Sequence, residues 1–419
     1  MADVTVTACA AEGKSLARVD GKVIFVEGAV PGDRVDILLT KSKKDWAEGK
    51  VLRFKEYAKD RVDPFCEHFG LCGGCKWQML PYPLQLKYKE EEVKQQLGRI
   101  GKVSLPPMQP IIGAQETTAY RNKLEFTFSN KRYVTHEDLK TLDQLGPDER
   151  EAITGAAVGY HVSKIFDKVI DINRCHLMED RANGIRNFIR GHALQYGLSF
   201  YDIRAHVGWL RNLILRSCTT GELMVNLCIG HEDKAAREIL LQALLKEFPS
   251  ITSLYYTINS KWNDSLYDLE PTLYHGKAWV TEKLGDLSFR IGPKSFFQTN
   301  TRQAEALYTV VKDFAGLQGD EILYDLYCGT GSIGLFLSAQ AGKVIGVETV
   351  PEAVADAKEN AAINNITHAE FFAGDVIDVC ADGFFAHHGR PDVIVTDPPR
   401  AGMHEKLVRK ILEIGRASC

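Results

Sequence analysis

The sequence predicts an α/β multidomain protein with an N-terminal OB-like β-barrel, a central α+β domain and a C-terminal Rossmann-like domain. Its 419 residues suffice for two or three domains. Three observations predict this division: β-rich runs near the N-terminus, three crowded cysteines after them, and strands alternating with helices from about residue 291. We expect domains at residues 1–57, 58–290 and 291–419.

The N-terminal domain is predicted from KVIFVEGAVPGDRVDILLTK, which has two β-rich runs around a Pro-Gly-Asp turn. The segment from Lys41 to Arg61 holds eight basic and four acidic residues, together with Trp46, Phe54 and Tyr57. A small barrel with a basic face that carries aromatic rings suits single-stranded nucleic acid. A solvated lysine-rich surface explains the same composition.

The central domain is predicted to begin with the cysteines and a helix at 81–101, amphipathic and ended by glycine. Further along, strand-like runs such as LEFTFSN, LILRSC and ELMVNLCIG alternate with helical ones such as KAAREILLQALLKEF. In the C-terminal domain the strands EILYDLYC, KVIGVET, AEFFAGD and PDVIVTD alternate with helices. Buried strands that alternate with helices predict a parallel, doubly wound sheet.

Composition excludes several classes of protein. No run of about 18 or more apolar residues occurs, so the sequence predicts no membrane span. The N-terminus has no basic region before an apolar core, so we expect no secretory signal and a cytoplasmic location. The net charge of −4 gives no global sign of a nucleic-acid partner, so any basic surface must be local.

Three of the ten cysteines, Cys66, Cys72 and Cys75, are crowded in CEHFGLCGGC. In a reducing compartment, clustered cysteines more often hold metal than form disulfides. Three thiolates need a fourth ligand for tetrahedral zinc or a cubane iron–sulfur cluster, and Cys175 in INRCHLM is our candidate. The spacing alone favours zinc, and buried thiols without a metal are the alternative.

A glycine loop, DLYCGTGSIG, follows a strand and opens a helix, and its Gly329, Gly331 and Gly334 spell GxGxxG. Such glycines let the backbone approach a cofactor at the carboxyl edge of a sheet. Glu348 ends the next strand, where it can accept hydrogen bonds from ribose hydroxyls. These features fit a dinucleotide or S-adenosylmethionine equally.

The motif TDPPR favours S-adenosylmethionine over a dinucleotide, because a rigid Asp-Pro-Pro turn beside a glycine loop is typical of methyltransferases that act on nucleobases. Its Asp397 ends the fourth strand, and Asp375 ends the third, where it could accept from an adenine amino group. A helix cap or turn is the alternative role for Asp397, and a solvated strand end is the alternative for Glu348.

Several stretches between residues 60 and 403 together carry a family resemblance: CEHFGLCGGCKWQ, AYRNKLEFTFS, INRCHLM, LRNLILRS, GPKSFFQTNTRQAEALY, DLYCGTGSIGLFLS and TDPPRAGM. The chain resembles the RNA 5-methyluridine methyltransferases, and most closely the 23S ribosomal RNA uracil-5-methyltransferases that carry an iron–sulfur cluster and a TRAM domain. The resemblance implies a class I methyltransferase domain, a TRAM barrel that binds RNA, and a monomer. It also implies that the 81–101 helix packs on the methyltransferase domain.

The resemblance further implies site residues. Cys66, Cys72, Cys75 and Cys175 would hold a [4Fe-4S] cluster, in place of the zinc that spacing favours. S-adenosylmethionine would be contacted by Gln298, Tyr327, Glu348 and Asp397. The partner would be RNA, with 23S ribosomal RNA as substrate, and the target uridine would be flipped out of the RNA fold.

Methylation of uracil carbon 5 needs a thiolate that adds to carbon 6 and a base that removes the carbon-5 proton. In the family the cysteine follows the DPPR helix in a pattern like SCNP, and a glutamate base comes later. Neither pattern occurs here, so no catalytic residue is assigned and we expect the nucleophile beyond residue 419. Cys419 and Cys328 are not expected to take its place.

The ending EIGRASC resembles an in-frame sequencing adapter, so we expect a truncated reading of the gene. Three alternatives stay open: an inactive fragment that binds RNA and cofactor, a transfer-RNA uracil-5-methyltransferase, and an adenine amino-methyltransferase. The last is disfavoured because Arg400 stands where that chemistry wants an aromatic residue. Arg121, Asn122 and Lys123 are candidate RNA contacts or strand-edge residues.

Overall fold

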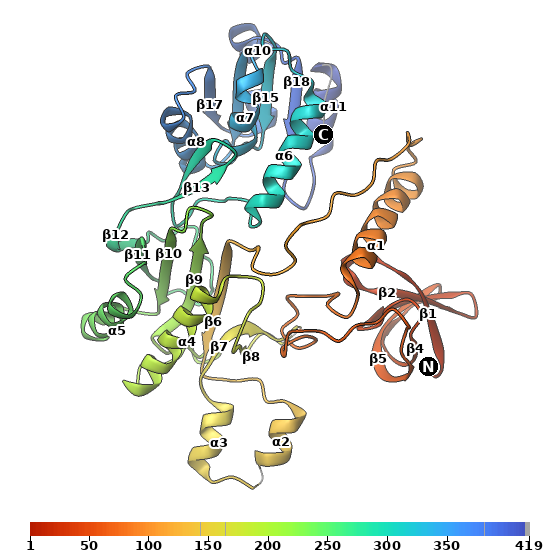
Figure 1. Ribbon diagram of the computed structural model, residues 1–419, viewed down its shortest axis with the longest axis vertical. Coiled ribbons are helices and arrows are strands. Elements are labelled where there is room, and N and C mark those ends of the chain that lie inside the picture. The colour runs from red at the N-terminus through yellow and green to blue at the C-terminus, as the bar shows by residue number, and fades with distance from the viewer. Residues whose placement is uncertain (143, 164, 381, 415–419) are drawn as a thin grey trace. The chain divides into compact units, whose positions relative to one another are not determined.

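The computed structural model describes residues 1–142, 144–163, 165–380 and 382–414 (Figure 1). The chain forms two compact units, and each is described by itself. Unit 1 comprises Met1–Thr117, Lys131–Thr154 and Gly159–His176, and unit 2 comprises Thr118–Asn130, Gly155–Val158 and Leu177–Cys419. In the described part of the chain, no helix is long and apolar enough to cross a membrane.

The N-terminal barrel of unit 1 is closed, with strand order β1-β2-β3-β5-β4. Its strands are β1 (Val4–Cys9), β2 (Ser15–Val19), β3 (Lys22–Glu27), β4 (Arg34–Ser42) and β5 (Trp46–Glu56), and a short 3₁₀ turn spans Ala11–Gly13. Alternate residues such as Val6, Ile24 and Ile37 fill its interior. Gly49 is required on β5, because a Cβ there would lie 2.5 Å from Ile37 and 2.8 Å from the Leu38 carbonyl oxygen. The predicted barrel is confirmed.

The remaining elements of unit 1 are mostly short. They are α1 (Tyr82–Gln95) with a π-helical turn (Gln96–Ile100), α2 (His136–Leu142), α3 (Pro147–Thr154), β7 (Ala157–His161) and β8 (Val169–Asp171). A helix is therefore confirmed at the predicted place. Its apolar face is narrow, because Leu84 and Tyr88, one turn apart, touch a small apolar cluster while no residue of α1 is fully buried. Packing of α1 on the methyltransferase domain stays a prediction.

A central sheet in unit 2 has strand order β12-β11-β10-β9-β6. The strands are β6 (Lys123–Ser129), β9 (Leu210–Ser217), β10 (Leu223–Ile229), β11 (Ser253–Ile258) and β12 (Thr272–Gly276), and the helices are α4 (Asp180–Gln195) and α5 (Lys234–Glu247). Only β10 and β11 run parallel in this group. Phe188 of α4 meets Phe248 edge to face, so the two helices pack together.

A hairpin and a helix precede the last domain: β13 (Val280–Leu284), β14 (Leu287–Ile291) and α6 (Thr301–Ala315). The Asn300 side chain accepts from the Gln303 N–H and so caps the start of α6. Gly316 ends the helix with φ +59°, a conformation that glycine adopts without strain.

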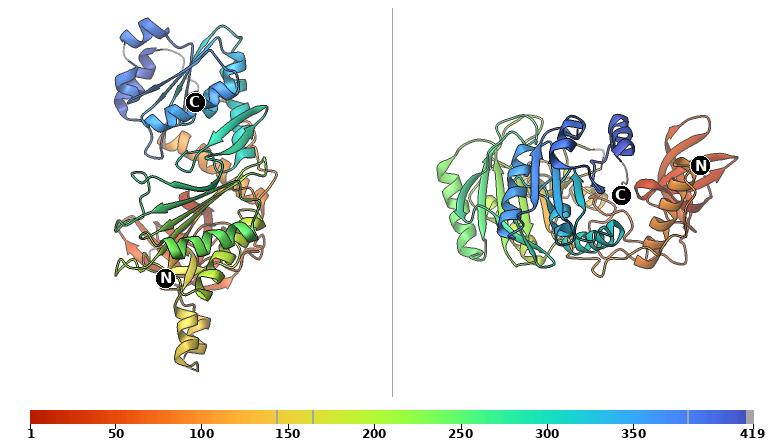
Figure 2. Two further views of the ribbon diagram at one scale, coloured as in Figure 1. Left: turned by 90° about the vertical axis from the view of Figure 1, so that its left-hand side faces the viewer. Right: turned by 90° about the horizontal axis from the view of Figure 1, so that it is seen from above.

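The C-terminal sheet is parallel, with strand order β17-β16-β15-β18 (Figures 1 and 2). Its elements are β15 (Ile322–Leu326), α7 (Ser332–Leu337) with a 3₁₀ turn (Ser338–Gln340), β16 (Lys343–Glu348), α8 (Pro351–Ile363), β17 (Ala369–Ala373), α9 (Val376–Val379), α10 (Asp382–His388), β18 (Val393–Thr396) and α11 (Glu405–Ile414). Residues of α6, α7 and α8 share one apolar core, and residues of α9, α10 and α11 share another. The predicted doubly wound sheet is confirmed for these four strands.

Candidate functional site

The loop after β15 turns sharply, as GxGxxG predicts. Gly329 and Gly331 have φ of +52° and +79°, and a Cβ on Gly331 would lie 3.1 Å from both Ala357 and the Phe371 ring. Tyr327 also has a positive φ, +66°, although it carries a bulky side chain. Such strain is found where a site fixes the backbone. The loop therefore places the backbone of two residues without side chains, Gly329 and Gly331, at the carboxyl edge of the sheet.

Glu348 ties this loop to the end of β16. One of its carboxylate oxygens accepts from the Gly329 N–H at 3.1 Å. The other accepts from the Thr349 hydroxyl and the Val350 N–H, both at 3.0 Å. Glu348 is therefore a bound strand-end residue whose position is fixed relative to the loop.

Gln298 and Asp397 meet at the same edge of the sheet. The Gln298 Nε2 donates to the Asp397 Oδ2 at 3.0 Å, although 99 residues separate the two in sequence. Tyr308 of α6 lies nearby and shares a 3.0 Å hydrogen bond with Ser332 of α7. Burial raises the pKa of Tyr308 to about 12, so its hydroxyl stays protonated. The structure thus brings together two residues that the sequence places far apart.

Asp375 has a structural partner that the sequence did not predict. Its side chain caps α9 by accepting from the Ile377 N–H at 2.8 Å. The expected contact with an adenine amino group stays a prediction. One carboxylate oxygen of Asp375 is used in this cap, and the hydrogen bond fixes the position of Asp375 shortly after β17.

Asp325 on β15 was missed by sequence reasoning. It is fully buried, and its Oδ2 accepts from the Gly334 N–H at 2.7 Å. Its Oδ1 has no hydrogen-bond partner among the described residues. Burial raises the pKa of Asp325 to about 7, and the negative charges of Asp397 and Glu348 contribute to this increase. The hydrogen bond from the Gly334 N–H acts in the opposite direction. An acid inside a strand, four residues before Gly329, was the available signal.

Asn122 is buried and has a structural role, so the prediction that it contacts RNA is wrong. Its Nδ2 donates to the Gln298 carbonyl oxygen at 2.8 Å and to the Thr301 hydroxyl at 2.9 Å. Thr301 in turn donates to buried Glu282 at 2.8 Å. Asn122 therefore holds the segment that carries Gln298. Burial lowers the pKa of neighbouring Lys123, helped by the charge of Arg216.

The four predicted metal ligands lie in two loops of unit 1 that contact each other. The Asn173 N–H donates to the His68 Nε2 at 3.0 Å, and Phe65 meets His176 edge to face at 5.2 Å. Burial raises the pKa of Cys75, and the charges of the other three thiols, Cys66, Cys72 and Cys175, raise it further. Gly73 has φ +68°, and a Cβ on Gly74 would come within 3.7 Å of the Cys72 sulfur.

A complete metal site is not formed by these cysteines. Among residues that the structure describes, no group of three or more His, Cys, Asp or Glu side chains is arranged to hold a metal ion. The predicted ligation is therefore not confirmed, although the four thiols belong to one unit and act on one another. All four are half-buried rather than packed into an apolar core.

The described cysteines of unit 2 are poor candidates for a nucleophile. Cys218, Cys228, Cys328 and Cys380 are all buried. Burial raises the pKa of Cys380 to about 11 and that of Cys328 far above its usual range. A thiol that holds its proton cannot attack a base efficiently. Cys419 and the rest of the segment 415–419 lie outside the described residues.

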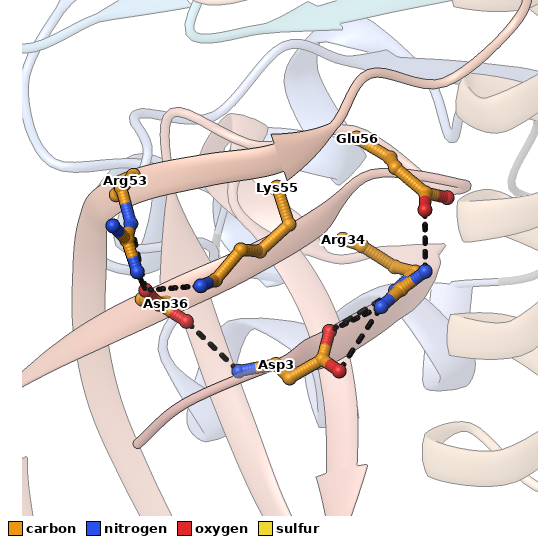
Figure 3. Close-up of polar contacts among 6 residues, drawn as sticks. All are labelled: Asp3, Arg34, Asp36, Arg53, Lys55 and Glu56. Atoms are coloured by element: carbon orange, nitrogen blue, oxygen red, sulfur yellow. Dashed lines mark hydrogen bonds and ion pairs between the residues drawn. The ribbon is translucent and has the colours of Figure 1, made fainter.

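The basic face predicted for the barrel is partly neutralised. Figure 3 shows the ion pairs, which join Arg53 and Lys55 to Asp36 at 2.9 and 3.5 Å, and Arg34 to Asp3 and Glu56 at 2.9 and 2.5 Å. Arg61 pairs with Asp33 at 2.8 Å and lies over the rings of Phe54 and Tyr57. These cations stabilise the barrel itself, so fewer of them are available to RNA than composition indicates.

The end of the β4–β5 hairpin keeps its positive charge. Lys41 lies 5.0 Å from the centre of the Trp46 ring, and Lys43 and Lys44 are exposed. Within the described ranges neither Lys43 nor Lys44 has an ion pair. Exposed cations next to an aromatic ring are the groups that bind phosphates and unpaired bases.

The fold and the site together define a methyltransferase with an N-terminal TRAM barrel. Residues 2–52 match the TRAM domain, and residues 318–413 match a methyltransferase domain family. An uncharacterized RNA methyltransferase of Porphyromonas gingivalis is 47% identical over 97% of this chain and 87% of its own length. Another, from Bacteroides thetaiotaomicron, is 48% identical over 96% and 88%. The chain therefore belongs to the RNA methyltransferases.

A solved structure has a similar fold over most of the chain. The Pyrococcus abyssi tRNA (uracil-54, C5)-methyltransferase in complex with S-adenosyl-L-homocysteine matches 97% of this chain and 87% of its own, with a TM-score of 0.71. Its sequence identity is 24%, so the likeness concerns the fold.

Proposed function

We propose that this RNA methyltransferase transfers a methyl group from S-adenosylmethionine to carbon 5 of uracil in RNA. The hydrogen bond between Gln298 and Asp397 is the observation that carries the proposal. It places the SFFQTN and TDPPR segments side by side at the carboxyl edge of the parallel sheet, where ligands of such sheets bind. The fold shared with the P. abyssi uracil-C5 enzyme supports the same reaction.

The cofactor residues divide into three roles. Gly329 and Gly331 provide the backbone surface against which the cofactor lies, and Tyr327 covers it. Glu348 accepts from the ribose hydroxyls, with Asp375 toward the adenine. Gln298 and Asp397 fix the end of the cofactor that reacts. S-adenosylmethionine, when bound, supplies the electrophilic methyl group.

The target uracil needs a thiolate at carbon 6, and the described cysteines of the methyltransferase domain are too buried to supply it. Cys328 is 5% exposed and Cys380 is 1% exposed. We therefore propose no catalytic residue among them. The alternative of a chain that binds RNA and cofactor without catalysis stays open.

We propose further that Cys66, Cys72, Cys75 and Cys175 hold a [4Fe-4S] cluster. Their chemistry fits, because four cysteines from two loops that contact each other are the number and kind of ligands that such a cluster takes. Gly73 of the CGGC turn has a positive φ, which lets the backbone turn tightly between Cys72 and Cys75. The cluster would join the 66–75 loop to the 173–176 loop and so stabilise the unit.

The RNA substrate is proposed to be 23S ribosomal RNA, bound by a monomer in the cytoplasm. The TRAM barrel and the four cysteines favour this choice by the resemblance of their sequences. Transfer RNA is the second candidate, since the similar P. abyssi enzyme is named for it and covers 97% of this chain. The exposed end of the β4–β5 hairpin can bind either RNA through phosphates.

The test is methyl transfer from labelled S-adenosylmethionine to full-length 23S ribosomal RNA and to transfer-RNA transcripts, using anaerobically purified full chain. Label recovered as 5-methyluridine supports the proposed reaction, and the labelled transcript identifies the substrate. Label in an adenine amino group overturns it. Cofactor binding without label on any RNA favours the inactive alternative.

A further inference from the structure

Two exposed aromatic residues lie in the loop that follows β11 of the central sheet. Trp262 is 75% exposed and Tyr267 is 90% exposed, which is unusual for side chains of this size. Both belong to the loop 259–268 after β11. Nothing in the methyl-transfer site uses this loop.

Buried Arg211 of β9 anchors the loop. Its guanidinium donates to the carbonyl oxygens of Asn259, Lys261 and Asn263, and to the Asp264 carboxylate at 2.8 Å. The side chain is 1% exposed. Four bonds from one buried cation fix the backbone on both sides of Trp262. The tryptophan is therefore presented to solvent by a preorganised support.

The Trp262 ring is already stacked on one side. It lies parallel to the His206 imidazole, with the ring centres 4.8 Å apart and the planes 7° apart. His206 adopts φ +57° in a turn closed by buried Asp202, whose Oδ1 accepts from the Arg204 N–H at 2.9 Å. The strained backbone of His206 thus belongs to a turn that aligns its imidazole with the Trp262 ring.

A cavity of about 210 Å³ adjoins this stack. Its lining includes Tyr201, His206, Arg211, His231 and Ser260. The Tyr201 ring lies 4.0 Å from the Arg211 guanidinium carbon and covers one side of it. The Arg211 Nε is buried and has no acceptor among the described residues. The cavity therefore has aromatic and imidazole side chains and a guanidinium group in its lining.

We infer that the Trp262–His206 stack and the adjoining cavity bind an unpaired nucleobase of the RNA substrate. Aromatic rings stack on any base, and the guanidinium group in the cavity lining adds a positive charge that favours RNA. The inference rests on the proposed RNA substrate and adds a second contact, separate from the methyl-transfer site. This second contact would bind a single-stranded segment of the RNA next to the target uridine.

The first test compares RNA binding by the full chain and its Trp262→Ala variant, using a 23S ribosomal RNA transcript and an oligouridine. We expect the variant to raise the Kd roughly 10-fold, because base stacking on an aromatic ring contributes that much. Trp262→Phe should keep most of the affinity. Tyr267→Ala removes a ring of the same loop that is even more exposed and has no stacking partner among the described residues, and it should leave the Kd within about 2-fold.

The second test uses fluorescence. The tryptophan emission lost in Trp262→Phe reports on this site, and single-stranded RNA should protect it from acrylamide quenching while a fully paired duplex should not. Equal Kd values for wild type and Trp262→Ala, or no protection by RNA that binds, overturn the inference. Failure of the wild-type chain to bind any RNA would instead count against the proposed function.

Discussion

The Gln298 amide donates a 3.0 Å hydrogen bond to the Asp397 carboxylate and joins the segment before α6 to the end of β18. A second bond makes this contact firm, since Asn122 donates to the Gln298 carbonyl oxygen from the start of β6. Three segments distant in sequence therefore define one edge of the candidate site. Its geometry depends on the central sheet as well as on the methyltransferase domain.

Asp397→Asn should lower S-adenosylmethionine affinity, measured by calorimetry, roughly 10- to 100-fold. The reason is the loss of a charged acceptor that orients Gln298 and the cofactor. The thermal transition should change little, because Asp397 is exposed. Glu405→Gln on the exposed surface of α11 is the matched control, and equal affinity in both variants would show that Asp397 does not contact the cofactor.

Asp325 predicts a pH dependence of stability. Its pKa is raised to about 7 in the folded protein from 3.8, so the folded state binds more protons than the unfolded state between about pH 4 and 7. Its contribution to the free energy of unfolding is therefore greatest at low pH and is lost as pH rises through about 7. Asp325→Asn keeps the shape and removes the charge. The gain in melting temperature of this variant over wild type should grow from pH 5 to pH 8, and a constant difference would contradict the burial argument.

The cysteine prediction concerns metal content. Anaerobically purified chain should contain about four iron and four sulfide per molecule, with broad absorbance near about 400 nm. Cys75→Ser and Cys175→Ser should lose both. Cys9→Ser, which changes a half-buried thiol of β1 outside the group, should retain them. One zinc per chain without colour would favour the alternative metal, and no metal at all would leave four unliganded thiols.

Lys43 and Lys44 should contribute to RNA affinity through phosphate contacts. The double variant Lys43→Ala and Lys44→Ala should weaken binding at low salt and reduce the slope of log affinity against log salt by roughly 1 to 2. Lys55→Ala is the control, because Lys55 already pairs with Asp36 at 3.5 Å. An unchanged slope in the double variant would move the RNA surface away from this hairpin.

Local pattern was enough to determine the barrel, the parallel sheet and the glycine loop. Each depends on neighbours in sequence: alternating apolar residues, turn residues, and glycines that permit positive φ. The grouping of Cys66, Cys72 and Cys75 is local in the same sense. The apolar face of α1 is narrower than we expected, since its residues are half-buried or exposed.

Only the tertiary structure decided which polar residues act together. Asn122 and Gln298 are 176 residues apart, and no periodicity reports that one holds the other. The burial that raises the pKa of Asp325 depends on residues outside its strand, and the partners of Arg211 lie about 50 residues away in a loop. These contacts form through long-range packing. The free energy that stabilises them is spread over many residues, so the local sequence pattern does not reveal them.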